Sequence, residues 1–408
     1  MDELAVWIDG IRVAVIRREK GRIHLAYTED ALDRFDLGTP LVSLSLPLIP
    51  ERYPQGVVTA FLDNLLPEGE PRRAIARELG TSDRDVFGLI RELGRDCAGA
   101  LVIQPNDEAP PVTDSTLAAE PIEREDLAHM VENLRFAPLG TGGRVRVSLA
   151  GVQEKLALTR LGDGQWGRPV DGTPSTHILK PEIAAYPFTV ENEAFCMRLA
   201  KRLGLDVATV ETTTIAERKL IIVERFDRLV ASGGQTRRLH QEDFCQAFGL
   251  RPDRKYEDEG GPSLCRIAQL LMTVAERGSA DNLLKAVVLN VVLGNGDAHA
   301  KNYSILRDTS GALRLAPLYD LMSTLHYGDG RLAMSIGGVT RIERISADRI
   351  LNEATGWGMN RGRASELLDD LIQRIPEAVM AAADETPGLP MEIPAIARSQ
   401  LELLKSRS

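Results

Sequence analysis

Three oxygen-bearing side chains near residue 300 have the types and the order that phosphoryl transfer requires. Asp297 precedes Asn302 by five residues in Gly-Asn-Gly-Asp-Ala-His-Ala-Lys-Asn, and Asp320 ends the run Pro-Leu-Tyr-Asp. Transfer from ATP needs one carboxylate to orient or accept the hydroxyl proton, and hard oxygen ligands to hold Mg²⁺ against the phosphates. Protein kinases supply them as an Asp-x4-Asn loop followed by a metal-binding Asp. We therefore expect an ATP-dependent kinase.

The sequence around this loop favours function over a plain polar turn. Asp-x4-Asn alone occurs by chance, and Asn, Gly and Asp are common turn formers. Here an apolar helix predicted over residues 286–293 leads into the loop. A strand predicted from Tyr303 and a returning strand that ends at Asp320 would form a hairpin. Such a hairpin would bring oxygens of Asn302 and Asp320 to one metal ion.

Three further stretches have residue types suited to a nucleotide. Lys180 ends the run His-Ile-Leu-Lys, where a strand lysine would contact the α- and β-phosphates and could pair with Glu193; the alternative is a solvated lysine. Small residues in 148–155 could form a backbone cradle for phosphates, although they fit no standard glycine-rich motif and could form any turn. Residues 224–228 (Glu-Arg-Phe-Asp-Arg) are either an adenine-binding hinge or a charged surface turn.

Composition limits the class of protein. A chain of 408 residues suggests two or three domains. The net charge of −10 and the pI of about 5.3 argue against a broad nucleic-acid-binding surface, but leave room for a local basic patch or a basic partner. Four scattered cysteines predict reduced thiols rather than a metal site. Because the sequence shows no signal peptide and no membrane-length apolar run, we expect a soluble cytoplasmic protein.

Periodicity and turn residues predict a mixture of strands and helices. Strands are expected at 4–8, 11–16, 23–27, 41–46, 98–103, 207–215 and 220–223. Helices are expected at 59–66, 70–79, from Thr81 onward, at 123–134 and from Glu191 to the residue before Gly204. Residues 105–121 predict a linker, and beyond residue 240 the pattern is almost wholly helical apart from the hairpin at 303–320.

These segments, in this order, resemble the HipA-type Ser/Thr kinases, the toxin component of bacterial HipBA toxin–antitoxin modules. The pair Ala-Gly-Val-Gln-Glu-Lys (150–155) and Gly-Asp-Ala-His-Ala-Lys-Asn (296–302) is the most specific part of a resemblance that extends from residue 4 to about 380. The other matching segments are 44–48, 61–67, 94–96, 176–180, 223–228, 241–246, 255–256, 260–262 and 317–320.

The resemblance implies an α+β fold, with an N-terminal α+β subdomain on a bilobal protein-kinase-like body whose C-terminal lobe is mainly helical. Residues 1–107 would form the N-terminal subdomain, and 108–140 a linker with a short helix. Residues 141–235 would form a β-rich N-lobe with the phosphate loop, and 236–408 the helical C-lobe.

The resemblance also implies roles by position. Asp297 would be the catalytic base, Asn302 and Asp320 the magnesium ligands, and Lys180 a phosphate contact. The loop over ATP would comprise Ala150, Gly151, Val152, Gln153, Glu154 and Lys155. The nucleotide pocket would be lined by Glu224, Phe226, His299, Lys301, Asn302, Tyr319 and Asp320. Autophosphorylation of Ser148 would eject the loop and switch the kinase off.

Partners follow from the same resemblance. The substrate would be an aminoacyl-tRNA synthetase, typically the glutamyl enzyme, and the partner a HipB-like helix-turn-helix antitoxin that holds the kinase on operator DNA. Two departures are the Pro181-Glu182 pair after Lys180 and the tail 402–408, to which we assign no DNA contact. Two alternatives remain open: a small-molecule phosphotransferase, and a catalytically silent corepressor.

Overall fold

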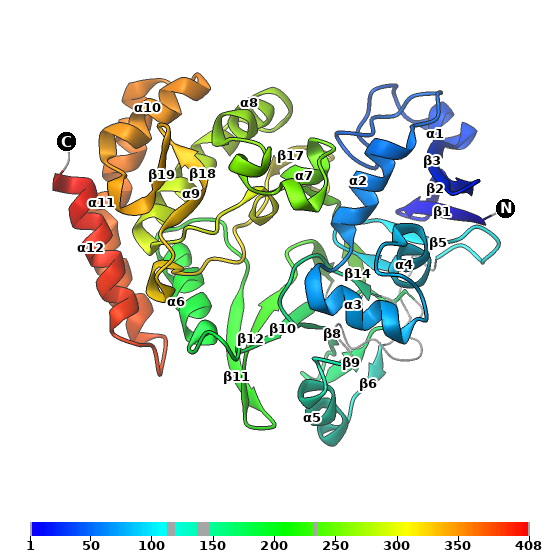
Figure 1. Cartoon of the computed structure of the whole chain (residues 1–408), viewed down its shortest axis with the longest axis horizontal. Coiled ribbons are helices and arrows are strands. Elements are labelled where there is room, and N and C mark those ends of the chain that lie inside the picture. The colour runs from blue at the N-terminus through cyan, green and yellow to red at the C-terminus, as the bar shows by residue number, and fades with distance from the viewer. Residues whose placement is uncertain (1, 112–118, 137–146, 171, 232–234, 407–408) are drawn as a thin grey trace. The chain divides into compact units, whose positions relative to one another are not determined.

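The computed structural model describes residues 2–111, 119–136, 147–170, 172–231 and 235–406. The chain divides into two compact units (Figure 1). The first unit comprises residues 1–181 and 214–252, and the second comprises 182–213 and 253–408. The four-part division expected from the sequence stays a prediction. Residues 105–111 and 119–121 of the predicted linker are described, whereas residues 112–118 and 137–146 lie outside the described ranges.

The first unit begins with an antiparallel sheet in the order β3-β2-β1-β5. Its strands are β1 (Asp2–Ile8), β2 (Ile11–Glu19), β3 (Arg22–Tyr27) and β5 (Val102–Pro105). The predicted hairpin is confirmed: Asp9 and Gly10 both take positive φ, which is the backbone that a two-residue turn requires. The fourth strand begins at Val102 rather than at 98. Helices α2 (Gln55–Leu65) and α4 (Val86–Leu93) pack on β3 and β5 over one buried core.

The helices of this part of the chain are α1 (Glu29–Arg34), α2 (Gln55–Leu65), α3 (Gly69–Glu78) and α4 (Val86–Leu93). The last of these begins after the N-cap Asp85, whose side chain accepts from Gly88 N, and not at Thr81. The predicted strand at 41–46 is wrong. Glu242 accepts hydrogen bonds from Ser43 Oγ and Leu44 N, which holds this segment in a turn with only an isolated bridge between Ser43 and Leu46.

A second sheet of the described chain has the order β11-β12-β10-β8-β9-β6. Its strands are β11 (Val210–Ile215), β12 (Arg218–Glu224), β10 (His177–Pro181), β8 (Leu156–Arg160), β9 (Trp166–Arg168) and β6 (Glu120–Pro121). The boundary between the units falls within β11. Short elements complete the first unit: β4 (Asp96–Cys97), α5 (Arg124–Glu132), β7 (Val147–Ser148), β13 (Arg228–Val230), β14 (Thr236–Arg238), β15 (Gln241–Asp243) and α7 (Phe244–Ala247). A separate apolar cluster lies between α5 and this sheet.

The second unit is mainly helical, as expected. Its helices are α6 (Thr189–Arg202), α8 (Leu264–Val274), α9 (Ser279–Leu293), α10 (Ala347–Trp357), α11 (Arg361–Asp384) and α12 (Glu392–Ser406). Helix α9 is buried along most of its length and packs against α8, α11 and α12, the last two drawn orange to red in Figure 1. The predicted hairpin is present as β16 (Ser304–Arg307) and β17 (Leu313–Leu315). Its returning strand ends at Leu315 and not at Asp320 as predicted, since Pro317 has no N–H to continue the pairing. The pair β18 (Arg331–Ile336) and β19 (Val339–Arg341) was not predicted.

Candidate active site

The predicted catalytic loop begins where α9 ends. Gly294 takes a left-handed backbone (φ +69°), and its N–H bonds to the carbonyls of Asn290 and Val291. The next residue, Asn295, also donates its backbone N–H to Asn290 O at 2.9 Å. Glycine at this position ends a helix without steric cost and satisfies its last carbonyls. The buried helix therefore fixes the position of the buried Gly296 and the exposed Asp297 in the second unit.

A buried network of polar side chains supports the loop from beneath. Asn290, the polar residue within the apolar part of α9, donates to the Tyr303 hydroxyl at 2.9 Å and accepts from Asn295 Nδ2 at 2.8 Å. Asn295 Oδ1 in turn accepts from the backbone N–H of Asp297 at 3.2 Å. Burial raises the pKa of Tyr303, so its hydroxyl stays protonated at all ordinary pH values. The network fixes the backbone at Asp297 by neutral hydrogen bonds.

The structure brings Asp297 and Asn302 together. A short 3₁₀ helix, η3 (Ala300–Asn302), folds the chain back so that Asn302 Nδ2 donates to the carbonyl oxygen of Asp297 at 3.0 Å. This bond occupies the amide NH₂ group and leaves Oδ1 as the oxygen that Asn302 can offer a metal ion. The Tyr256 hydroxyl donates to Asp297 Oδ1 at 2.8 Å. Sequence reasoning gave no role to Tyr256, which lies 41 residues before Asp297.

The surroundings raise the pKa of Asp297 above the ordinary aspartate value. Although the side chain keeps contact with solvent, partial burial is the largest cause, because it disfavours the carboxylate. The hydrogen bond from Tyr256 and the charge of Lys255 oppose this shift, whereas the negative charges of Asp320 and Asp329 add to it. A carboxylate with a raised pKa is a stronger base, which suits a group that must accept a proton.

The second predicted carboxylate, Asp320, follows the hairpin of β16 and β17. Before it, Leu318 forms a parallel bridge with Val207, and the Tyr319 hydroxyl donates to Lys301 O at 2.7 Å. Asp320 itself takes a left-handed backbone (φ +57°), which is uncommon for a residue with a side chain and costs on the order of 1 kcal/mol or more. Its negative charge adds to the rise in the pKa of Asp297.

Two other predicted residues of the pocket, His299 and Lys301, are buried in the same loop. The ring of His299 meets the ring of Tyr256 edge-on at 5.3 Å, and Lys301 supplies the carbonyl that Tyr319 binds. Both therefore help to hold the loop whether or not they touch a nucleotide. Their assignment to a nucleotide pocket stays a prediction.

In the first unit, residues 148–155 close on themselves. Lys155 Nζ donates to the carbonyl oxygen of Ala150 at 2.6 Å. Gly151, between them, takes φ +113°, and a Cβ there would lie 2.6 Å from the Lys155 amine. Gln153 Nε2 donates to Pro181 O at 3.0 Å, which ties the loop to the end of β10. Glu154 lies 3.6 Å from Arg218. Val152 is largely exposed.

Lys180 lies near the end of β10, opposite Ile221 of β12, and is buried. Of the two hinge candidates, Glu224 is exposed at the end of β12 and Phe226 is half-buried. Lys180 belongs to the first unit, whereas Glu193, Asp297 and Asp320 belong to the second. The pairing of Lys180 with Glu193 and the contacts of Lys180 with phosphates therefore stay predictions.

The residues between the hinge candidates form a buried ion network, which sequence reasoning missed. Arg225 binds both carboxylate oxygens of Asp227 at 3.0 and 2.8 Å, and Arg228 binds Asp96 at 2.8 Å. Arg225 also donates to Ser175 Oγ, which is bonded to Asp96. Burial alone would raise the pKa of Asp96 and Asp227, but the arginine charges hold the pKa of both carboxyl groups below the ordinary value. Residues 224–228 are therefore not a surface turn.

The network joins strand ends that carry predicted site residues. Ser175 precedes β10 with Lys180, and Arg225 separates Glu224 from Phe226. The sequence carried one indication of this network: segments 94–96 and 223–228 both match the family. They lie about 130 residues apart in the chain, and the fold brings them into contact.

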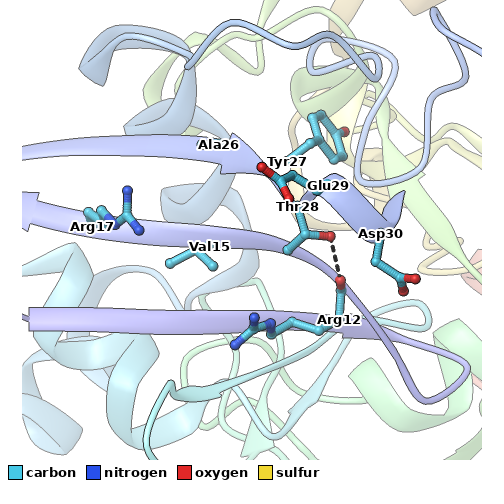
Figure 2. A pocket seen from close by; sticks show the side chains of 8 residues that line it. All are labelled: Arg12, Val15, Arg17, Ala26, Tyr27, Thr28, Glu29 and Asp30. Carbon is cyan, nitrogen blue, oxygen red and sulfur yellow. Dashed lines mark hydrogen bonds between the residues drawn. The ribbon is translucent and has the colours of Figure 1, made fainter. Parts of the chain in front are cut away.

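A surface hollow of about 460 Å³ lies elsewhere in the first unit, on β2, β3 and the start of α1 (Figure 2). Its two arginines already have partners: Arg12 binds Asn106, and Arg17 binds Glu3. Thr28 donates to the Arg12 carbonyl, as the dashed line shows. None of the predicted site residues lines this hollow.

Comparisons with known proteins cover both units. The family model described as "HipA N-terminal domain" matches residues 4–104, and the one described as "HipA-like C-terminal domain" matches residues 147–379. The serine/threonine-protein kinase toxin HipA of Shewanella oneidensis is 35% identical over 339 residues, which cover 79% of this chain and 76% of that protein. The protein Y4mE of Sinorhizobium fredii is 40% identical over 396 residues, 95% of this chain and 93% of that protein.

A solved structure agrees with these sequence matches. HipA of Shewanella oneidensis, in a complex with HipB and operator DNA, superposes with a TM-score of 0.82 at 29% identity, covering 98% of this chain and 96% of that one.

Within the described ranges of this chain, the helices are all too short or too polar to cross a membrane.

Proposed function

This chain belongs to the HipA family of serine/threonine-protein kinases, and from that premise we propose that it transfers the γ-phosphate of ATP to a serine of a translation enzyme, with Asp297 as the base. The observation that carries the proposal is the loop in which Asn302 is bonded to Asp297 and the pKa of Asp297 is raised. Kinase activity is a property of the family, whereas the roles of individual residues are part of the proposal.

The chemical step needs little covalent work from the protein. The acceptor hydroxyl oxygen forms a bond to the γ-phosphorus while the bond from that phosphorus to the β,γ-bridging oxygen breaks. ADP leaves with that oxygen, and the hydroxyl proton passes to Asp297 Oδ. Tyr256 holds one oxygen of Asp297 and thereby orients the other toward the acceptor. Catalysis then rests on positioning and charge stabilisation.

The residues present fit a magnesium ion. Asn302 offers Oδ1 because its NH₂ group is bound to Asp297 O. Asp320 offers a carboxylate, and its negative charge is one cause of the raised pKa of Asp297. Mg²⁺ prefers such oxygen ligands and is usually held by one or two protein groups together with phosphates. When bound, the ion would neutralise charge on the phosphates. Asn302 and Asp320 are the ligands we propose.

The residues of the first unit fit the phosphates of ATP. Gly151 has a backbone that only glycine adopts readily, and the space beside it is taken by the Lys155 amine. We assign Ala150, Gly151, Val152, Gln153, Glu154 and Lys155 to the loop over ATP. Lys180 would bind phosphate, and Glu224 and Phe226 would contact the base. In the second unit, the nucleotide-binding residues we propose are His299, Lys301 and Tyr319.

Partners and substrate extend the proposal. The S. oneidensis HipA was solved with HipB and operator DNA, which supports a HipB-like helix-turn-helix antitoxin as the partner here, with DNA bound through it. We propose an aminoacyl-tRNA synthetase, of the glutamyl type, as the substrate and the cytoplasm as the location. The family resemblance of the motifs supports both.

We also propose that Ser148 is autophosphorylated. Its side chain is fully buried, its Oγ donates to Leu65 O at 2.8 Å, and its backbone pairs with Cys97 of β4. A hydroxyl in this position cannot reach ATP. Ser148 must therefore leave β7 before it is phosphorylated, and a phosphate would prevent its return because a dianion would have to be buried.

The test is mass spectrometry of the purified chain before and after incubation with ATP and Mg²⁺, beside Asp297→Asn and Ser148→Ala. We expect one added phosphate at Ser148 in the wild-type chain, none in Asp297→Asn, and a rate loss of about 10²–10⁴-fold toward a protein acceptor in that variant. Wild-type transfer by Asp297→Asn would overturn the base assignment. A chain that is bare at zero time and stays bare would favour the small-molecule kinase or the corepressor.

A further inference from the structure

Helix α6 of the second unit holds the segment that follows Asp320. Asn192 is fully buried on α6, and its side chain makes two reciprocal hydrogen bonds to the backbone of Ser323. Asn192 Nδ2 donates to Ser323 O at 3.1 Å, and Asn192 Oδ1 accepts from Ser323 N at 2.9 Å. One amide thus satisfies both main-chain groups of a buried residue, as a neighbouring strand would. Asn192 and Ser323 are 131 residues apart in the chain.

The next residue, Thr324, ties the same segment to the catalytic loop. Thr324 Oγ1 accepts from the backbone N–H of Gly296 at 2.8 Å and donates to Asp329 O at 2.8 Å. Gly296 directly precedes Asp297. On its other side the carbonyl of Gly296 accepts from Ala333 N at 2.7 Å. The segment 323–324 therefore lies between α6 and the backbone of the proposed base.

Asp320 needs such support. Its left-handed backbone is strained and persists only where neighbouring contacts fix it. On the N-terminal side, the chain is fixed by Leu318, whose N–H donates to Asp206 O at 2.8 Å. On the C-terminal side, Leu321 is buried, and Ser323 is held by both hydrogen bonds of Asn192. Without those bonds the segment could relax toward an ordinary backbone and turn the Asp320 carboxylate away.

We propose that Asn192 is a positioning residue for phosphoryl transfer, which sets the Asp320 carboxylate through Ser323 and steadies Asp297 through Thr324 and Gly296. The inference rests on the proposed function, because it takes Asp320 as a metal ligand. Helix α6 then has a defined role, because any shift of this helix moves both carboxylates together. A purely structural asparagine would stabilise the fold and leave the metal site unchanged.

The experiment compares Asn192→Ala with Thr386→Ala in the full-length chain. Thr386 is a matched control, because it is also buried and also bonded to α6, through Arg198 at 2.9 Å, but at the other end of the helix. Mn²⁺ binding in the presence of ADP is measured by electron paramagnetic resonance, and transfer from radiolabelled ATP to casein gives kcat and KM. Thermal unfolding is recorded for each variant.

We expect Asn192→Ala to weaken Mn²⁺ binding about 10–100-fold, as loss of a partner that orients a metal ligand does, and to lower kcat with little change in KM for ATP. Thr386→Ala should change both quantities less than threefold. If Asn192→Ala melts earlier but binds Mn²⁺ and turns over like the wild type, the positioning role is wrong.

Two further outcomes keep the inference separate from the proposed function. If the wild-type chain binds Mn²⁺ with ADP but transfers no phosphate, the proposed function fails while the binding comparison still decides the role of Asn192. If the wild-type chain binds no Mn²⁺, both proposals fall. Should Asn192→Ala not fold, Thr324→Val is tested instead, because valine keeps the shape of threonine but removes the hydrogen bond to Gly296. We expect a tenfold lower kcat. An unchanged kcat would overturn the proposed link from Thr324 through Gly296 to Asp297.

Discussion

Asp227→Asn tests the buried ion network of the first unit. Asp227 accepts two hydrogen bonds from Arg225 and one from Gly99 N at 2.7 Å, and it lies 3.0 Å from Arg228. All three charged side chains are almost completely buried. Asparagine keeps the size of the side chain but removes its charge. The variant leaves two buried guanidinium groups, with Asp96 as the carboxylate beside both.

The magnitude follows from burial. Removing one partner of a buried ion pair costs about 3–5 kcal/mol, because the remaining charge loses its compensation while it stays desolvated. The first unit contains segments of 181 and 39 residues, a size at which each kcal/mol lowers the melting midpoint by about 2–4 °C. We therefore expect the melting transition of this unit to fall by about 6–20 °C. At a temperature where the variant is folded, phosphoryl transfer should persist.

The assay is differential scanning calorimetry at neutral pH, with Asp30→Asn as the control. Asp30 pairs with Arg34 on the exposed face of α1, and exposed pairs of this kind contribute about 1 kcal/mol or less. If the melting temperature of Asp227→Asn falls no further than that of Asp30→Asn, the buried charges are not compensating one another as we infer.

The effect of pH has a definite sign. Burial would raise the pKa of Asp227, but Arg225 and Arg228 hold it below the ordinary value, so the native carboxylate stays charged further into acid than the unfolded one. The stabilisation is present above the unfolded pKa of about 3.9 and is lost as pH falls through the folded pKa. The difference between the wild type and Asp227→Asn should therefore shrink below about pH 4.

Two predictions concern the catalytic loop. Tyr256→Phe removes a hydrogen bond that lowers the pKa of Asp297, so that pKa should rise and the acidic limb of the kcat–pH profile should move to higher pH; a limb that stays or moves down contradicts the tuning by Tyr256. Gly296→Ala would place a Cβ against the Arg331 carbonyl, so the loop must shift and transfer should fall at least tenfold, whereas Gly356→Ala, which meets nothing within 4 Å, should transfer at the wild-type rate. Equal rates for the two glycine variants would contradict the close packing at Gly296.

Local signals in the sequence predicted much of the fold. Asp9-Gly10 dictates a tight hairpin turn, Gly204 and Gly294 end helices with left-handed backbones, and the hairpin after Tyr303 follows from two short apolar runs. Each of these features depends on a few adjacent residues. The family and the kinase class were predicted because whole motifs, and not single residues, resemble HipA, and the comparisons confirm both.

Contacts distant in sequence were not predicted. The alternation of residues 41–46 indicated a strand, but the carboxylate of Glu242, about 200 residues later, holds Ser43 and Leu44 in a turn. The charged run 224–228 was weighed as a surface turn because its partners, Asp96 and Ser175, lie far away along the chain. In both cases a side chain from another part of the chain overrode the local pattern.

The same division applies within the candidate site. Asp297 and Asn302 were predicted as site residues from their spacing because one loop carries both, and a hydrogen bond of 3.0 Å joins them in the structure. Beside the nearby Asn295, two distant side chains support Asp297: Tyr256, 41 residues before it, bonds to its carboxylate, and Thr324, 27 residues after it, bonds to the adjacent Gly296. Motif spacing within one loop cannot predict such contacts, because the fold brings these residues together from distant parts of the chain. A relative that keeps the Asp-x4-Asn spacing but lacks a tyrosine at position 256 should therefore perform the same reaction with its acidic limb at higher pH.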